Sequence, residues 1–235
     1  MTRVSMVMAP GVYIIEHGNV DSAVREFVAR TLTDVYQIER PEYVEVHIYE
    51  TRGHVKLPVH NDIVVNAEYE GGLFHEAWAG YPRIHVIVED IVNVEGSTRR
   101  AMLVHEAAHS ILHGSQEYYV VALCEYNDLR SVHVAYTVVK DLEVHLWMAS
   151  RGFMQELGRL RDYFDDGVVG CGTIEDVSNE ARRLTVYIAL GGHPEMRCGK
   201  ISRVLYNLLK RVARCKPRPW ACRNEVLDVI DAIGG

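Results

Sequence analysis

Two histidines and a glutamate stand close together in LVHEAAHSILHG, residues 103–114. His105 and His109 are four residues apart, so on an α-helix they differ by only about 40° around the axis and project from one face. Two imidazoles one turn apart can both reach a single zinc ion. Glu106 lies about 60° beyond His109, where a carboxylate can take a proton from a water molecule on that ion. This HExxH pattern therefore predicts a metal site with a general base beside it.

A third histidine, His113, ends the same segment. Eight residues of helix rise by ~12 Å, so His105 and His113 cannot bind one ion. We expect His113 to be a helix-end residue that faces the terminal carbonyl groups, with Gly114 stopping the helix. The third protein ligand must therefore come from another segment.

The next strongly helical segment, residues 136–152, offers that ligand as Asp141 or Glu143. The two carboxylates lie about 200° apart on a helical wheel, so at most one of them can face the ion. Both flank the apolar face of the segment about equally. Helical periodicity leaves the choice open.

A family resemblance bears on this choice. RRAMLVHEAAHSILHG, residues 99–114, resembles the active-site helix of gluzincin metallopeptidases, especially the ImmA/IrrE-like group, whose HExxH is often followed by a Leu-His pair. DLEVH, residues 141–145, resembles the gluzincin ExxAD or ExxAN pattern, with an aspartate in place of the ligand glutamate and a histidine in place of the closing acid. The resemblance covers roughly residues 83–150. It implies a zinc peptidase with Glu106 as general base and Asp141 as third ligand, Glu143 being the alternative.

The surrounding pattern predicts an α+β fold, with a small mixed sheet packed on the HExxH helix and a following ligand helix. We expect a zincin-like domain over residues 1–165 and a helical C-terminal extension over 172–235. Asp21 should cap a helix that runs to about Ile38, and Ser97 or Thr98 should cap the HExxH helix. Further expected elements are strands at 44–49 and 83–90, an extended segment at 54–69, and helices at 132–150, 174–190, 199–214 and 223–233.

The strand RIHVIVED, residues 83–90, has two interpretations. As an edge strand near the active-site helix, it could pair with an extended peptide substrate. As an interior strand, it would only support the helix. The sequence does not choose between them.

Bulk composition excludes several classes of protein. The 235 residues are 48% hydrophobic and 24% charged, which is ordinary globular composition. No apolar run approaches the ~18 residues that cross a membrane, and no signal peptide is recognisable, so we expect a cytoplasmic protein. The net charge of −7 argues against a general nucleic-acid binder. Residues 197–223 carry nine lysines and arginines and no acid, which leaves a nucleic-acid partner open but not favoured.

Four of the five cysteines fall in the last third of the chain: Cys171, Cys198, Cys215 and Cys222. Their spacing contains no CxxC pair, which argues against a structural zinc site. Free thiols are the ordinary state in a reducing cytosol, and disulfides in a hyperthermophile are the alternative. The sequence does not give a pairing.

The group that stabilises the oxyanion of peptide hydrolysis also stays open, because several side chains could donate to it: Tyr118, Tyr119, His75, His85 and His133. The leading hypothesis is a zinc-dependent metallopeptidase. The alternatives are a metal-binding protein without proteolysis, a nucleic-acid-associated regulator that uses the basic segment, and an accidental HExxH with no metal.

Overall fold

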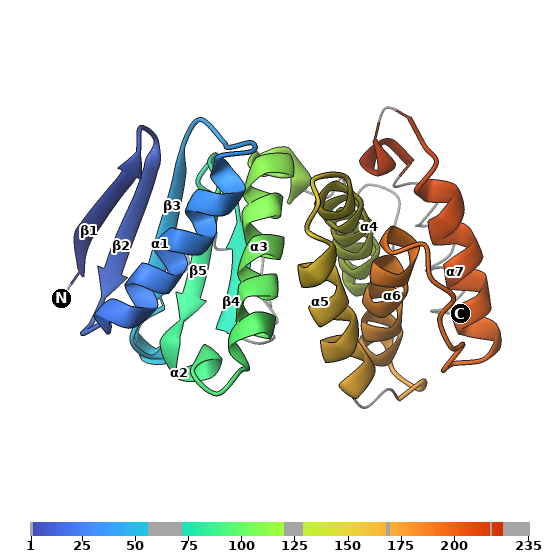
Figure 1. Cartoon of the computed structure of the whole chain (residues 1–235). Helices are drawn as coiled ribbons and strands as arrows, with labels where there is room; N and C mark the ends of the chain where they lie inside the picture. The colour runs from blue at the N-terminus through green and yellow to red at the C-terminus, as the bar shows by residue number, and fades with distance from the viewer. Residues whose placement is uncertain (1, 56–71, 120–128, 168–169, 217, 223–235) are drawn as a thin grey trace. The chain divides into compact units, whose positions relative to one another are not determined.

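The computed structural model describes residues 2–55, 72–119, 129–167, 170–216 and 218–222 (Figure 1). Within these ranges the chain forms seven α-helices and one five-stranded mixed sheet, which confirms the predicted α+β class. The chain divides into two compact units, Met1–Val120 and Val121–Gly235. The boundary expected at 165–172 falls inside the second unit, because the helices on either side of it share side-chain contacts.

The sheet of the first unit holds its strands in the order β1 (Thr2–Ala9), β2 (Val12–His17), β3 (Val44–Tyr49), β5 (Arg83–Ile87) and β4 (Leu73–Glu76). The two outer pairs are antiparallel and the two inner pairs are parallel. β5 is therefore interior, and the edge interpretation of residues 83–90 is wrong. That strand also ends at Ile87, because Val88–Ile91 forms the short helix α2.

The hairpin of β1 and β2 is an element that the sequence interpretation did not include. Gly11, which follows Pro10, has a φ of +85° in the turn between the strands. A Cβ at Gly11 would lie 1.9 Å from the carbonyl oxygen of Glu42, so only glycine fits there. The Pro-Gly pair before an alternating strand is the local signal for this hairpin.

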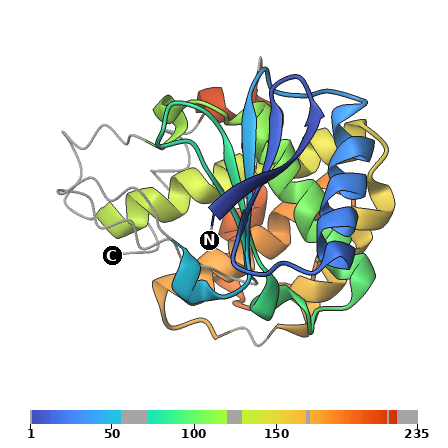
Figure 2. The same cartoon turned by 90° about the vertical axis from the view of Figure 1, so that its left-hand side faces the viewer.

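One face of the sheet packs against the helices α1 (Ser22–Tyr36) and α3 (Gly96–Leu112), as Figures 1 and 2 show. Strand residues on this face are buried and apolar: Val12, Ile14, Val44, Val46, Ile48, Ile84 and Val86. The side chain of Asp21 accepts a hydrogen bond from the Ala23 amide at 2.8 Å, so the predicted cap of α1 is confirmed. Burial of the apolar faces of both helices fixes α3 on the sheet.

The second unit is helical, with α4 (Leu129–Ser150), α5 (Met154–Asp166), α6 (Ile174–Ala189) and α7 (Lys200–Val212). α6 packs against the other three helices. α5 was not predicted, whereas α4, α6 and α7 lie within a few residues of their expected positions. Residues 56–69 of the extended segment predicted at 54–69 lie outside the described residues, as does the helix predicted at 223–233. The start of that segment is not extended, because His54 belongs to the short 3-10 helix η1 (Arg52–His54). No helix in the described part of the chain has both the length and the apolar character needed to cross a bilayer.

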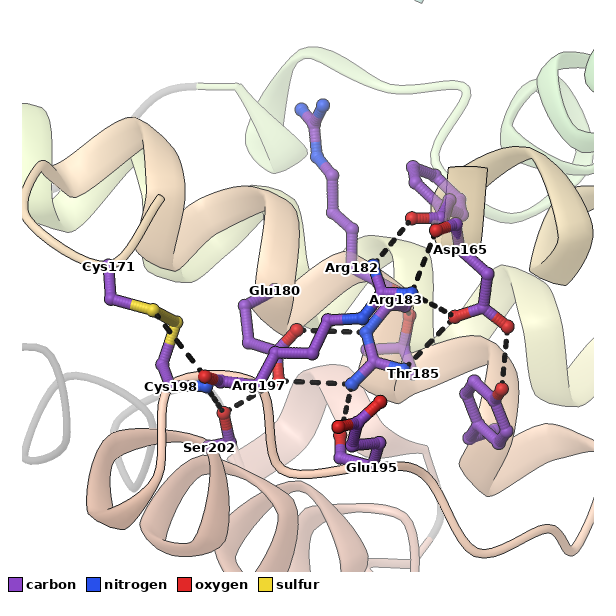
Figure 3. Close-up of polar contacts among 12 residues, drawn as sticks. Asp165, Cys171, Glu180, Arg182, Arg183, Thr185, Glu195, Arg197, Cys198 and Ser202 are labelled. Atoms are coloured by element: carbon purple, nitrogen blue, oxygen red, sulfur yellow. Dashed lines mark hydrogen bonds and ion pairs between the residues drawn. A yellow bond between two sulfur atoms is a disulfide. The ribbon is translucent and has the colours of Figure 1, made fainter. Parts of the chain in front are cut away.

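A buried polar cluster joins the helices of the second unit (Figure 3). The guanidinium of Arg183 donates from Nε to Glu180 at 2.8 Å and from Nη1 to Asp165 at 3.1 Å. Ser202 on α7 donates to the same Glu180 carboxylate at 2.6 Å. Arg183 and Glu180 are both almost fully buried. Each side chain neutralises the charge of the other, and either charge alone would be costly to bury.

Two disulfides, Cys171–Cys198 and Cys215–Cys222, connect four cysteines of this unit. The basic helix α7 buries its apolar side in the core of the second unit. The sequence pattern predicts that Val204 also lies on this apolar side, but its side chain is 40% exposed.

Candidate metal centre

The HExxH residues lie in the second half of α3, whose start differs from the prediction. Glu95, and not Ser97 or Thr98, is the N-cap, because its carboxylate accepts from the Thr98 amide at 3.1 Å. Hydrogen bonds from Ser97 and Thr98 lower the pKa of Glu95 to about 2. A charged carboxylate at the N-terminal end of a helix also interacts favourably with the helix dipole.

A buried hydrogen-bond chain holds α3 on α1. The hydroxyl of Ser110 donates to the Ala107 carbonyl at 2.7 Å and lies 2.8 Å from the hydroxyl of Tyr36. Since the Ser110 proton is used on Ala107, the Tyr36 hydroxyl is the donor between the two. Burial raises the pKa of Tyr36, so this hydroxyl keeps its proton. The rotation of α3, and hence the direction of its histidines, is fixed by this contact and by the apolar core.

His105 and His109 direct their Nε2 atoms toward each other, at a separation of 3.0 Å. Their rings are nearly perpendicular, with an interplanar angle of 77° and centroids 4.6 Å apart. Glu106 lies between them in sequence and is partly exposed, as is His105, whereas His109 is buried. The prediction that the imidazoles of His105 and His109 share one face of α3 is therefore confirmed.

A second imidazole pair in the same unit shows what an ordinary hydrogen bond between histidines looks like. His17 Nε2 and His47 Nδ1 lie 2.9 Å apart, but these rings are almost parallel and their centroids are 5.2 Å apart. This is a hydrogen bond between two nearly parallel imidazoles. The rings of His105 and His109 are closer together and crossed, and the atoms that face each other are the two Nε2 nitrogens. Two nitrogen ligands of a tetrahedral zinc ion lie roughly 3.3 Å apart, which is close to the observed separation.

His113 has a role that the sequence did not reveal. Its amide donates to the His109 carbonyl at 2.7 Å, so it ends α3 as predicted. Its buried ring, however, lies against His109, with its Nδ1 2.9 Å from Nδ1 of His109. If His109 uses Nε2 for a metal, its Nδ1 carries the proton and donates to His113. An outer partner of this kind orients a metal-binding histidine and fixes its tautomer. The i, i+4 spacing from His109 to His113 was the available signal.

Asp141 and Glu143 lie on opposite sides of α4 and are both 6% exposed. Oδ2 of Asp141 forms an ion pair with Nε of Arg182 on α6, at 3.3 Å. Burial raises the pKa of Glu143 to about 7, and the charge of Arg218 only partly offsets this effect. The two carboxylates therefore have different surroundings, which helical periodicity could not distinguish because α4 is buried on both sides.

His145 lies one turn after Asp141 and is fully buried. Its Nδ1 lies 2.9 Å from the hydroxyl of Thr185, which itself donates to the carbonyl of Arg182. His145 therefore donates from Nδ1 to Thr185. This hydrogen bond fixes the tautomer of His145.

The side chains of His105, His109 and Asp141 make up a group that could hold a metal ion. Two imidazole nitrogens and a carboxylate oxygen are a ligand set that zinc takes in catalytic sites, with a fourth position left for water or substrate. Among the described residues, no group of this kind includes Glu143. The residues present thus fit a zinc ion, although the donor set does not identify the metal.

The residues predicted as candidates to stabilise the oxyanion lie in different parts of the fold. His75 on β4 packs its ring parallel to that of His109, at 5.9 Å between centroids and 11° between planes. Tyr119 forms a hydrogen bond of 2.5 Å with Nδ1 of His75. Tyr118 instead packs edge-on against His113, at 4.9 Å between centroids. His85 lies on the opposite face of the sheet, stacked on Phe74.

Comparisons of the chain with protein-family models, with curated protein sequences and with solved structures gave no match.

Proposed function

We propose that this protein is a zinc-dependent metallopeptidase of the gluzincin type, in which His105, His109 and Asp141 hold the metal. The observation that carries the proposal is the 3.0 Å separation of the His105 and His109 Nε2 atoms, with Glu106 next to His105 in the sequence. The buried partner of His109 supports it, because a histidine held at Nδ1 presents Nε2 to a metal.

Zinc bound by these residues would polarise the scissile carbonyl and lower the pKa of a water molecule. Glu106 accepts a proton from the attacking water as general base and then passes it to the leaving amine. His113 holds the ring of His109 in place during both steps. Asp141 contributes a negative charge that, together with two neutral imidazoles, leaves the centre with a net positive charge suited to an electrophilic role.

Replacing Glu106 tests this assignment. Glu106→Gln should keep the zinc content of the parent protein and abolish cleavage of a pool of quenched fluorescent peptides, because glutamine cannot accept the proton. Glu26→Gln, a change at an exposed glutamate on α1, is the matched control and should cleave like the parent. Cleavage by Glu106→Gln at the parent rate would exclude Glu106 as the base.

The main alternative is a metal-binding protein without proteolysis. It uses the same ligands and differs only in turnover. Zinc-loaded parent protein that cleaves no member of a broad peptide pool would favour this alternative.

The expected cytoplasmic location also remains a prediction, and cell fractionation with a reporter for the state of the cysteines would test it.

A further inference from the structure

A row of basic side chains on α7 takes no part in the candidate metal centre. Residues 197–223 hold nine lysines and arginines and no acid, and four of these cations lie on α7 itself. At 3.6 residues per turn, the four occupy an arc of about 100° around the helix axis. They are Lys200, Arg203, Lys210 and Arg211, and with Arg214 just after the helix they form what we call the basic face of α7.

The core of the second unit fixes the direction of the basic face. The apolar residues of α7 lie on the other side of the helix, where they are buried, and α7 packs against α6. Figure 1 shows α7 at the edge of this helical unit. On the basic face itself, Lys210 is partly exposed and the other four cations are exposed. Burial of the apolar side therefore presents the basic face to solvent.

A disulfide restrains the chain where the row leaves the helix. Cys215–Cys222 closes a short loop directly after α7, and Arg214 and Lys216 flank the first of these cysteines. Both cations are exposed. Because the closed loop limits their positions, less conformational entropy is lost when they bind a ligand.

The cations of the basic face have no carboxylate partner within the part of the chain that the structure describes. Arginines elsewhere on the surface do have one. Arg52 forms an ion pair with Asp90 at 2.9 Å, and Arg161 forms one with Asp162 at 2.7 Å. The charge of the basic face is therefore not neutralised locally, as it is around these other arginines.

Helix stability explains only half of the row. Lys210 and Arg211 lie in the last turn of α7, where a cation interacts favourably with the helix dipole. Lys200 and Arg203 lie in the first turn, where the dipole disfavours a cation, and this turn contains no acid. The cations at the start of α7 thus oppose the helix dipole, and an external anion would offset this cost.

The dimensions of the row match a polymer whose charges repeat at fixed intervals. The rise from Lys200 to Arg211 is about 17 Å, which is the length of about five phosphates along one strand of a duplex. Arginine can donate two parallel hydrogen bonds to one phosphate. The net charge of −7 does not oppose such a contact, because a charge acts over only about 8 Å at physiological ionic strength.

Two other anionic partners fit the basic face less well. A helix that binds a lipid surface inserts its apolar side, and the apolar side of α7 is already in the core. Single-stranded nucleic acid stacks its bases on exposed aromatic rings. The aromatic residue of α7, Tyr206, is buried, and Nζ of Lys210 lies 5.2 Å from the centroid of its ring.

We infer that the basic face of α7 binds the phosphate backbone of a nucleic-acid duplex without reading its base sequence. Binding releases counterions from the duplex, so the affinity falls steeply as the salt concentration rises. The inference does not depend on the proposed peptidase function, since none of these cations belongs to the candidate metal centre.

Fluorescence anisotropy of the purified full chain with labelled short duplexes of DNA and of RNA tests the inference. The variant with Arg203→Gln, Arg211→Gln and Arg214→Gln combined should bind at least tenfold more weakly than the parent at about 50 mM salt. The slope of log affinity against log salt should fall by about 2.7, since each removed phosphate contact contributes about 0.9. Glutamine keeps a good helix propensity, and circular dichroism should show an unchanged helix content.

A matched control carries the same change of charge on exposed arginines outside α7: Arg30→Gln, Arg40→Gln and Arg159→Gln combined. This variant should bind both duplexes as the parent does. Equal weakening in the control would show that net charge alone governs binding, and would overturn the assignment to the basic face. Absence of binding by the parent at about 50 mM salt would overturn it as well.

Competition identifies the kind of anion. Two duplexes of unrelated sequence should displace the labelled duplex equally, and the duplex type that binds more tightly, DNA or RNA, identifies the source of the phosphates. Displacement by polyglutamate at the same charge concentration would overturn the inference in favour of an acidic protein. Tighter binding to vesicles that contain phosphatidylserine than to either duplex would overturn it in favour of a membrane.

Discussion

The Nδ1 atoms of His109 and His113 lie 2.9 Å apart, in a buried contact at the end of α3. In the tautomer in which His109 donates from Nδ1 to His113, its Nε2 is the unprotonated nitrogen. Nε2 is also the atom that faces His105. The end of the helix therefore contacts one imidazole of the group that could hold a metal ion.

Removal of this contact should weaken zinc binding without removing a ligand. His113→Phe is expected to lower zinc affinity by about 10–100-fold, the range typical of outer partners of metal ligands. His113→Asn, which keeps an acceptor, should recover part of the loss. Competition with a chromophoric chelator measures the affinity. His47→Gln, on the other face of the sheet, is the control, and an equal loss in that variant would show a general effect of destabilisation.

The third ligand can be identified by two matched substitutions on α4. Asp141→Asn should reduce zinc affinity by more than the roughly 100-fold upper range of outer partners, because it removes a charged ligand. Glu143→Gln should leave zinc affinity unchanged. The same competition assay applies to both variants. The reverse ranking would make Glu143 the ligand and Asp141 a structural partner of Arg182.

Some features of the site could be predicted from the sequence and others could not, for physical reasons that differ from residue to residue. Spacing predicted the His105–His109 pair, because neighbours one turn apart are set by the local geometry of a helix. It could not decide between Asp141 and Glu143, because that choice depends on helices distant in sequence that cover both sides of α4. It assigned the cap of α3 to the residue types that usually cap, and missed that the longer side chain of Glu95 reaches the Thr98 amide. Pairing of the cysteines likewise depends on long-range contacts.

The stability of the first unit should fall in mild acid. His17 donates to His47, which in turn lies 3.0 Å from Glu45, in a chain on the face of the sheet opposite α3. Burial, and then the neighbouring His47 and His54, lower the pKa of His17 to about 4. Burial also lowers the pKa values of His47 and His85. The folded state thus binds fewer protons than the unfolded state between about pH 6.5 and pH 4, so stability is lost as the pH falls through that window.

Chemical denaturation of the parent and of His17→Gln at about pH 7 and about pH 5 checks this prediction. Because His17 is partly exposed and solvent screens its neighbours, we expect its share of the loss to be on the order of 1 kcal/mol. The raised pKa of Glu143 acts in the opposite direction, so the informative quantity is the difference between parent and variant. An acid-induced loss that is the same in both proteins would contradict the role of His17.

The two disulfides should stabilise the second unit to different extents. Cys171–Cys198 spans 27 residues and Cys215–Cys222 spans 7 residues. Loop-closure entropy predicts a loss of about 3.5 kcal/mol for Cys171→Ser and about 2.4 kcal/mol for Cys215→Ser. Thermal unfolding with and without a reducing agent measures both. Identical unfolding of parent and variants under oxidising conditions would show that the cysteines are unpaired.

Elemental analysis of the purified protein tests the central claim most directly. The parent and Glu106→Gln should each carry a single equivalent of zinc per chain after dialysis against metal-free buffer, and His109→Ala should carry none. Circular dichroism of His109→Ala should match that of the parent, so that loss of zinc reports loss of a ligand. A parent protein without zinc that also fails to take it up on titration, or an unchanged zinc content in His109→Ala, would contradict the account.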